Sequence, residues 1–229
     1  MKNLTIVLLV LSTVLFSQTI LFEDDFNDGD AIGWMIVQPE GYYYVNDSLR
    51  YDISYDGSNQ VSPAVARGDS ASLFMTVQDY SVLVECIPHQ PSIALGIGLR
   101  FSLGDFAYVC WIWPDFDDID IWRHDGVGSY LVLGSVPYSF DWDESYWVRF
   151  ECEGDTLRAN VWQDPDPEPA EWMLIVSDTT YINNGCVVLY ATNVDGIGPA
   201  WAEFDNVVVT TISPGALEQS TWALIKSSF

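Results

Sequence analysis

Residues 147–162 have the sequence WVRFECEGDTLRANVW, in which apolar and polar side chains alternate on both sides of a Glu-Gly-Asp turn. Before the turn, Val148, Phe150 and Cys152 share one parity, and the charged residues share the other. A period of two residues is typical of a strand with one face in a core and one in water. Gly and Asp tolerate the left-handed backbone angles of tight hairpins. The stretch therefore predicts an antiparallel hairpin with one buried face.

Similar β-type runs fill most of the chain, separated by Asp-Gly and Asn-Gly turns. The predicted strands are Leu21–Phe26, Gly33–Val37, Tyr42–Val45, Ser48–Ser54, Ala71–Met75, Ser81–Ile87, Ala94–Phe101, Phe106–Trp113, Asp118–Arg123, Ser129–Val136, Trp147–Glu153, Asp155–Trp162, Glu171–Val176, Gly185–Ala191 and Ala200–Val209. Alternating strands can stack as two sheets with a shared core. The sequence thus predicts a single all-β domain over residues 18–212, a two-sheet antiparallel sandwich.

The two ends of this domain carry matching acidic and aromatic residues. Residues 22–26 are FEDDF, and residues 203–209 are EFDNVVV. This match predicts that the first and last strands lie side by side and close the sandwich.

The composition restricts the partners of the chain. The 229 residues are 49% hydrophobic and 14% aromatic, which is enough for a large core. The formal net charge is −25, from 33 acidic and 8 basic residues. Binding to nucleic acid or to anionic membranes requires Lys and Arg, so both classes of partner are disfavoured. Neutral glycans, cations and basic partners remain, as does the simpler interpretation that the charge only maintains solubility.

The two termini of the chain differ from the predicted sandwich. Lys2, the apolar run 4–16 and the small residue Ser17 predict a signal peptide over residues 1–17, with an uncleaved anchor as the alternative. The run is too short to span a bilayer comfortably, and no later run is long and apolar enough to do so. We therefore expect a secreted or cell-surface protein. In the tail, 213–229, Trp222, Ile225 and Phe229 share one helical face, which favours a short helix, an export or docking tag, or a frayed end.

The four cysteines, Cys86, Cys110, Cys152 and Cys186, each lie within a predicted strand. Their wide spacing gives neither a disulfide framework nor the close pairs of a zinc site. Export permits disulfides, whereas a free cysteine is often a small buried hydrophobe. Both interpretations remain open.

Three stretches together resemble concanavalin A-like lectin/glucanase domains, the laminin-G-like jelly rolls. Asp24-Asp25-Phe26 with Gly33-Trp34 resembles their opening strand, residues 147–162 their central hairpin, and 204–207 their closing strand. The resemblance covers most of residues 20–212. It implies a secreted jelly roll of two antiparallel sheets that often binds carbohydrate and sometimes only scaffolds a larger surface protein. Fold alone does not fix function.

A candidate ligand surface follows from strand parity. If Ile119 and Ile121 point inward, the neighbouring polar and aromatic side chains of their strand point outward, where they face sugars on a concave sheet. Indoles stack on the apolar faces of sugars, and carboxylates accept hydrogen bonds from hydroxyls. The predicted ligand-binding residues are Arg100, Trp111, Trp113, Asp118, Asp120 and Trp122. The alternative is that these tryptophans belong to the core or to cross-strand packing.

A structural calcium ion is a second candidate, because related jelly rolls often hold one that joins their ends. Calcium requires six to eight oxygen ligands. Asp24, Asp25 and Asp28 near the first strand could meet Asp205 of the last. The alternative is that these carboxylates are simply solvated.

Catalysis finds less support in the sequence. Glucanase-like members use a strand motif of the type Glu-x-Asp-x-x-Glu, and the nearest match here, Asp118-Ile119-Asp120-Ile121-Trp122, has no Glu. The two histidines, His89 and His124, lack a nucleophile motif. The sequence therefore favours a secreted, non-catalytic carbohydrate-binding or surface-interaction module. A structural or adhesive surface protein is the first alternative, and a glycoside hydrolase is the second.

Overall fold

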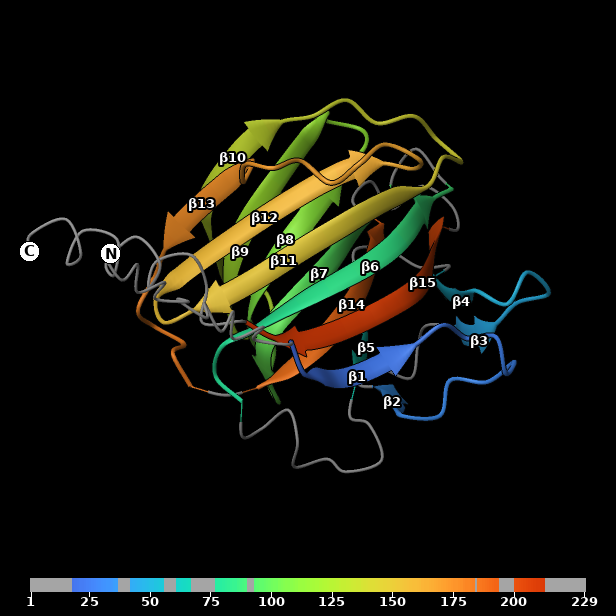
Figure 1. The fold of residues 1–229 in the computed structure, drawn as a ribbon, viewed down its shortest axis with the longest axis horizontal. Helices are drawn as coiled ribbons and strands as arrows, with labels where there is room; N and C mark the ends of the chain where they lie inside the picture. The colour runs from blue at the N-terminus through green and yellow to red at the C-terminus, as the bar shows by residue number, and fades with distance from the viewer. Residues whose placement is uncertain are drawn as a thin grey trace, which may run out of the picture.

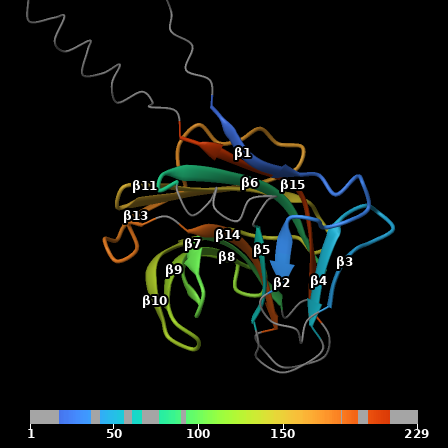
Figure 2. The same cartoon turned by 90° about the horizontal axis from the view of Figure 1, so that it is seen from below.

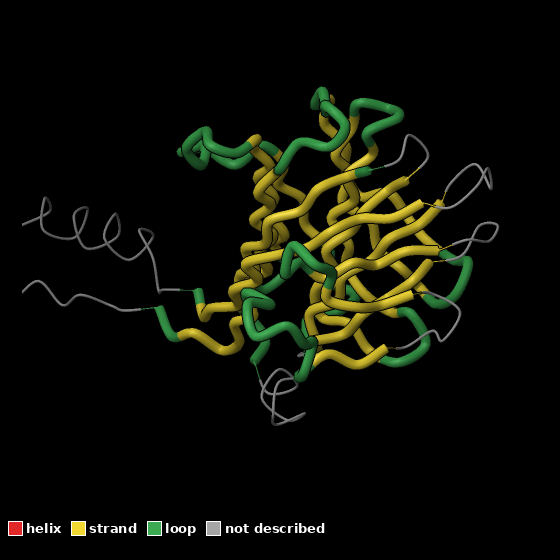
Figure 3. The backbone as a smooth tube through the Cα atoms, turned by 90° about the vertical axis from the view of Figure 1, so that its right-hand side faces the viewer, coloured by secondary structure: helices red, strands yellow, loops and turns green. Residues whose placement is uncertain are grey.

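Two antiparallel sheets form the described part of the protein, and no helix occurs in it (Figures 1 and 3). The computed structural model describes residues 18–36, 42–55, 61–66, 77–89, 93–183, 185–193 and 200–212. The predicted signal peptide, residues 1–17, and the tail, residues 213–229, lie outside the described residues. Among the described residues, no helix is long and apolar enough to span a membrane.

The first sheet has eight strands and lies in front in Figure 1. In spatial order these are β13 (Leu174–Ser177), β12 (Thr156–Gln163), β11 (Tyr146–Glu153), β6 (Tyr80–Pro88), β15 (Ala200–Thr211), β4 (Tyr51–Tyr55) and β3 (Tyr42–Val45), with β1 (Ile20–Asp24) also paired to β15.

The second sheet has seven strands and forms the other layer of the sandwich (Figure 2). In spatial order these are β10 (Tyr130–Pro137), β9 (Asp118–Asp125), β8 (Phe106–Trp113), β7 (Ile93–Ser102), β14 (Cys186–Asn193), β5 (Val61–Ala66) and β2 (Trp34–Ile36). The predicted all-β, two-sheet antiparallel architecture is confirmed.

The hairpin predicted from residues 147–162 is β11 and β12. Phe150 pairs with Ala159 and Cys152 with Leu157, and all four side chains are buried. Gly154 adopts a positive φ of 57° in the turn. The apolar side chains of the hairpin face the core, as their alternation with polar residues predicts.

The ends of the domain meet as predicted. β1 runs antiparallel to β15, with Glu23 opposite Val208 and Asp24 opposite Val207. β15 also pairs with β6 in the middle of the sheet, so this contact joins the ends of the domain to its centre.

One strand was not predicted from the sequence. β5 lies between β14 and β2 and contains Pro63, which pairs with Tyr190. Proline lacks an N–H and is usually confined to edge strands or bulges, so the sequence argued against an internal strand here. The predicted strand Ala71–Met75 lies outside the described residues.

All four cysteines are buried, and none of them forms a disulfide. Burial raises the pKa of the Cys86 and Cys110 thiols well above the ordinary value and that of Cys152 to about 11. Cys86, Cys110 and Cys152 therefore remain protonated, and all four cysteines pack as small core residues, which is the second of the two interpretations of the sequence.

Candidate functional site

Strand parity divides the seven-stranded sheet into an inner and an outer face. A Cβ placed on Gly134 of β10 would lie 2.7 Å from a methyl group of Val176 in β13, which belongs to the other sheet. Gly134 pairs with Ile121 of β9, so Ile121 also points inward, where it is fully buried. Its neighbours Asp120 and Trp122 therefore point outward, as predicted.

The predicted residues of β8 and β9 come together on this outer face. Trp113 lies opposite Asp118, and Trp111 lies opposite Asp120. Directly opposed residues of an antiparallel pair share a face. Both tryptophans and both carboxylates thus join Trp122 on one surface.

The rings on this face form a continuous aromatic layer. The Trp113 ring centroid lies 5.5 Å from that of Trp111 and 5.3 Å from that of Trp122. Tyr130 of β10 stacks on Trp122 at 4.6 Å with an interplanar angle of 21°. Phe116, in the turn between β8 and β9, contacts the edge of Trp113 at 6.1 Å.

This layer is buried at its centre and open at its margin. Trp111 is 2% exposed and Trp113 is 7% exposed, whereas Trp122 is only half-buried. Phe116 and Tyr130 are 62% and 60% exposed. Trp111 and Trp113 are therefore packed like core residues, whereas Trp122 is partly exposed to solvent.

Glycine makes room for the buried part of the layer. A Cβ on Gly96 of β7 would lie 2.8 Å from Cε3 of Trp111. The bare backbone at Gly96 thus lets the Trp111 indole pack closely against β7.

The polar atoms of the layer are engaged unevenly. Trp111 Nε1 donates to His124 Nε2 at 3.3 Å, and the other ring nitrogen of His124 lies 3.2 Å from Asp105. Trp122 Nε1 donates to Asp120 Oδ2 at 3.0 Å. By contrast, Trp113 Nε1 is buried and has no hydrogen-bond partner.

Sequence reasoning missed four members of this site: Asp105, Phe116, His124 and Tyr130. His124 has the parity of Trp122 two residues earlier, so the alternation, continued by one step, would have found it. Tyr130 required the register of β9 with β10, which places it opposite His124, and Asp105 and Phe116 lie in turns.

Arg100 does not line this surface, contrary to prediction. Its side chain is 1% exposed, and its guanidinium donates to the carbonyl oxygens of Gln78, Gly154 and Tyr181. The pairing of β7 with β8 shifts register between Leu99 and Ser102, and Arg100 itself has a φ of 54°. This bulge turns the side chain away from the face that simple alternation assigns to it.

The four carboxylates proposed for calcium do not form a metal site. Asp24 accepts hydrogen bonds from Phe26 N and from the Trp34 indole, while Asp25 and Asp28 each accept one from the backbone two residues ahead. Asp205 accepts from Asn206 N. Within the described ranges, no group of three or more His, Cys, Asp or Glu side chains is placed to hold a metal ion. The oxygens serve local turns instead, and no calcium chemistry is derived from them.

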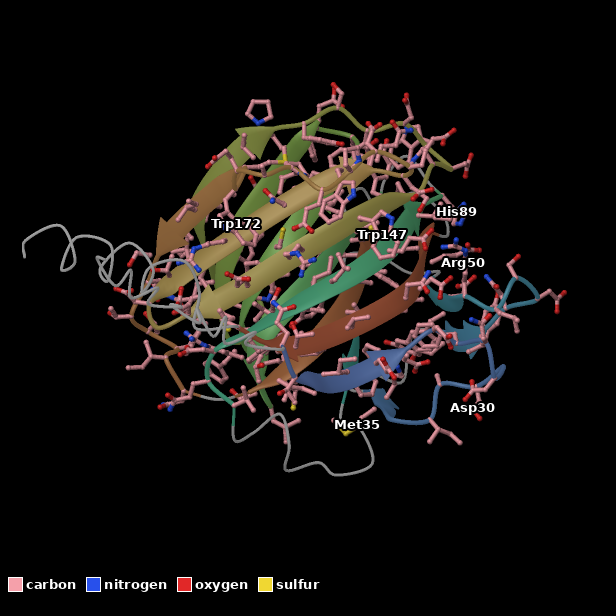
Figure 4. All side chains as sticks on the ribbon, viewed as in Figure 1. Asp30, Met35, Arg50, His89, Trp147 and Trp172 are labelled. Carbon is pink, nitrogen blue, oxygen red and sulfur yellow. The ribbon has the colours of Figure 1, made fainter. Side chains whose placement is uncertain are left out.

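A second polar cluster lies on the outer face of the eight-stranded sheet. Glu85 of β6 accepts hydrogen bonds from Arg50, Ser145 and Asn206 at 2.6–2.8 Å. Arg50 also lies 4.0 Å from Glu203. Figure 4 shows Arg50 and His89 at the same end of the sheet. These contacts join β6 and β15 to the loops that precede β4 and β11, so the role of the cluster is structural.

His89 makes this cluster sensitive to pH. Its Nδ1 lies 2.9 Å from Asp143, and its Nε2 lies 3.4 Å from Glu203. Burial disfavours the charged ring, but the hydrogen bonds and charges of these two carboxylates outweigh burial and raise the pKa of His89 above 6.5. The stabilisation is therefore complete below the pKa of the unfolded chain and is lost as pH rises through the folded value. In urea unfolding at a series of pH values, wild type should lose more free energy of unfolding above neutrality than His89→Gln, and equal slopes would contradict this.

Comparison with proteins of known structure places the fold among jelly rolls. The chain is similar to the carbohydrate-binding module CBM66 from Bacillus subtilis, with a TM-score of 0.60 and 16% identity over 80% of this chain and 98% of that one. It is similar to lectin II from Ulex europaeus, with a TM-score of 0.55 and 12% identity over 82% and 97% of the two chains. It also matches a xylan β-1,4-xylosidase from Bacillus halodurans C-125, with a TM-score of 0.57 and 16% identity over 82% of this chain but only 38% of the enzyme.

These likenesses show a concanavalin A-like fold, as the three sequence stretches indicated. No protein-family model matches the sequence, and no curated protein sequence matches it. At such low identity the comparisons establish the fold alone.

Proposed function

We propose that this chain is a secreted, non-catalytic carbohydrate-binding module and that the outer face of β8, β9 and β10 is its glycan-binding surface. The observation that carries the proposal is the half-buried Trp122, stacked with the exposed Tyr130 at the margin of a packed aromatic layer. Ring faces of this kind stack on the apolar faces of sugars, and Asp118 and Asp120 beside them accept hydrogen bonds from hydroxyls. The names of the similar structures, a carbohydrate-binding module and a lectin, agree with this proposal.

The buried layer beneath Trp122 supports the proposal further. A ligand-binding side chain recognises its ligand more tightly when neighbouring groups already hold it in place. Trp122 is held by contacts with Trp113 and Tyr130 and by its hydrogen bond to Asp120.

The variant Trp122→Ala tests this function on a glycan array. We expect wild type to be retained by at least one glycan class and Trp122→Ala to lose about tenfold or more in affinity, which corresponds to about 1.4 kcal/mol of lost stacking. Trp147→Ala is the matched control, because Trp147 stacks on Trp162 and donates to Asp164 on the opposite sheet (Figure 4). Wild type that binds no glycan, or equal loss in both variants, would contradict the proposal.

The burial of Trp111 and Trp113 favours a second candidate, a structural or adhesive surface protein that binds no glycan. Absence of binding to every glycan on the array, together with attachment of the protein to cells, would support this second candidate. Release of reducing sugar by the purified protein, abolished in Asp118→Asn and Asp120→Asn, would instead indicate a glycoside hydrolase. N-terminal sequencing of protein from the culture medium tests secretion, with Gln18 expected as the first residue.

A further inference from the structure

The outer face of β8 and β9 carries negative charge that no described cation neutralises. The Asp118 carboxylate makes no hydrogen bond or ion pair in the described structure, although the residue is partly buried beside Trp113. Asp120 accepts a hydrogen bond from Trp122, which is itself neutral. A partly buried carboxylate is expected to have a partner, because removal from water without one costs free energy.

The described arginines cannot provide that partner, because each is engaged elsewhere, and no lysine lies within the described ranges. The ion pairs are Arg50–Glu85, Arg100–Asp79, Arg123–Asp125, Arg149–Glu168 and Arg158–Glu151. Arg123 lies on β9, but its guanidinium also binds Asp178, which follows β13 of the other sheet. The face therefore has acidic groups and aromatic rings without an arginine or a lysine, and its one described histidine, His124, lies against Asp105.

Rings and carboxylates together are the chemistry that recognises an organic cation. An ammonium group is attracted to the face of an indole or a phenol ring, most strongly to that of Trp, and a nearby carboxylate adds Coulomb attraction. Trp113, Trp122 and Tyr130 supply the rings, and Asp118 and Asp120 supply the carboxylates, all from the same face of adjacent strands.

The Trp113 indole adds an independent requirement. Its ring is 7% exposed and lies between Trp122 and Phe116, yet its Nε1 donor has no acceptor. Buried donors are almost always paired, so this atom indicates a missing acceptor such as a hydroxyl or ring oxygen. A ligand that satisfies the whole face thus combines a positive charge, oxygen acceptors and an apolar ring face.

We infer that the ligand is an amino-sugar glycan whose amines are free and protonated. The inference rests on the proposed carbohydrate-binding function and specifies its substrate class. The ammonium group contacts Asp118 and Asp120, the sugar ring packs against the exposed Tyr130 and the accessible part of Trp122, and a sugar oxygen reaches Trp113 Nε1 after a small shift of the neighbouring side chains. An N-acetylated glycan of the same backbone lacks the charge, and an anionic glycan is repelled.

Two oligosaccharides of equal length test the inference by calorimetric titration of the intact chain: a β-1,4-glucosamine oligomer and its fully N-acetylated counterpart. In mildly acidic buffer, the glucosamine oligomer should bind about tenfold or more tightly than the acetylated one, a difference of about 1.4 kcal/mol. In alkaline buffer, where the amines are neutral, the difference should largely vanish. The double variant Asp118→Asn/Asp120→Asn should lose most of the preference in acid.

A matched control separates local recognition from the general attraction of a polycation to an acidic protein. Asp164→Asn/Glu168→Gln removes the same charge near Trp147, whose indole also donates to an aspartate. This variant should keep the preference. Equal losses in the two double variants would overturn the inference in favour of long-range electrostatics.

The remaining outcomes are equally decisive. Equal or tighter binding of the acetylated oligomer would overturn the amino-sugar inference and leave the glycan-binding function intact, as would array binding to other glycans with neither oligomer bound. Binding of poly-L-lysine with the same dependence on Asp118 and Asp120 would replace the glycan with a basic polypeptide. If no glycan of any class is bound, the proposed function and the inference fail together.

Discussion

Replacing Arg100 with methionine should lower the free energy of unfolding by about 2–4 kcal/mol, among the largest losses expected from a single change in this chain. The guanidinium is almost entirely buried and donates to Gly154 O and Tyr181 O at 2.8 Å and to Gln78 O at 3.1 Å. Hydrogen bonds from a charged donor are worth more than neutral ones, and methionine can replace none of them.

The cost is large because Arg100 fastens separate parts of the sandwich. It belongs to β7 of the seven-stranded sheet, whereas Gly154 forms the turn between β11 and β12 of the other sheet. Its own backbone N–H donates to the buried hydroxyl of Tyr80 in β6 at 2.7 Å. The loss of the side chain therefore loosens the contact between the two layers at this end.

Chemical unfolding of Arg100→Met and Arg149→Met in parallel measures this effect. Arg149 pairs with Glu168 at 2.6 Å, but on the outer face of β11 and beside water. Surface pairs of this kind contribute about 0–1 kcal/mol, so Arg149→Met should change stability little. A similar loss in both variants would mean that the buried network contributes no more than a surface pair.

The position of Arg100 illustrates where prediction from sequence ends. Simple alternation along β7 gives it the parity of Gly96, which does lie on the outer face beneath Trp111. A bulge of one residue reverses the parity of everything beyond it, and nothing in the residue types between Leu99 and Ser102 marks the bulge. The predicted outward face is therefore right for β8 and β9, which pair without interruption, and wrong for Arg100.

The overall architecture was easier to predict because it depends on composition and periodicity. The β11–β12 hairpin needs only its alternation and its turn, and both lie within sixteen consecutive residues of the sequence, 147–162. The pairing of β1 with β15 joins segments at opposite ends of the domain, and it was found because their compositions match. β5 has no corresponding prediction, and its Pro63 is a residue type that ordinarily argues against an internal strand.

Burial of the individual tryptophans could not be predicted, since it depends on neighbours brought together by the fold. Trp111 and Trp113 have the same parity as each other and face the same strands as Trp122. Trp111 and Trp122 differ in their position across the sheet. Trp111 lies over Gly96 and against Tyr190, whereas Trp122 lies beside β10, the last strand of the sheet.

The variant Trp111→Ala should destabilise the protein by about 3–5 kcal/mol, in the range measured for deletion of large buried rings. The ring centroids of four aromatic neighbours lie within 6.2 Å of the Trp111 ring centroid: Trp113, Trp122, His124 and Tyr190. Truncation opens a cavity above Gly96, which has no side chain with which to fill it. It also leaves His124 Nε2 without the indole N–H that donates to it at 3.3 Å.

Comparison with Trp122→Ala turns this stability prediction into a test of how the face is organised. Trp122 is half-buried, so its removal should cost clearly less free energy of unfolding than removal of Trp111, while glycan affinity should fall. Chemical unfolding and calorimetric titration on both variants give the two quantities. Trp111→Phe, which keeps a ring in the cavity, should recover a large part of the stability lost in Trp111→Ala. If Trp111→Ala lowers the free energy of unfolding no more than Trp122→Ala does, the aromatic layer is loosely packed. Trp111 would then contact the ligand directly and would not be the support for Trp122.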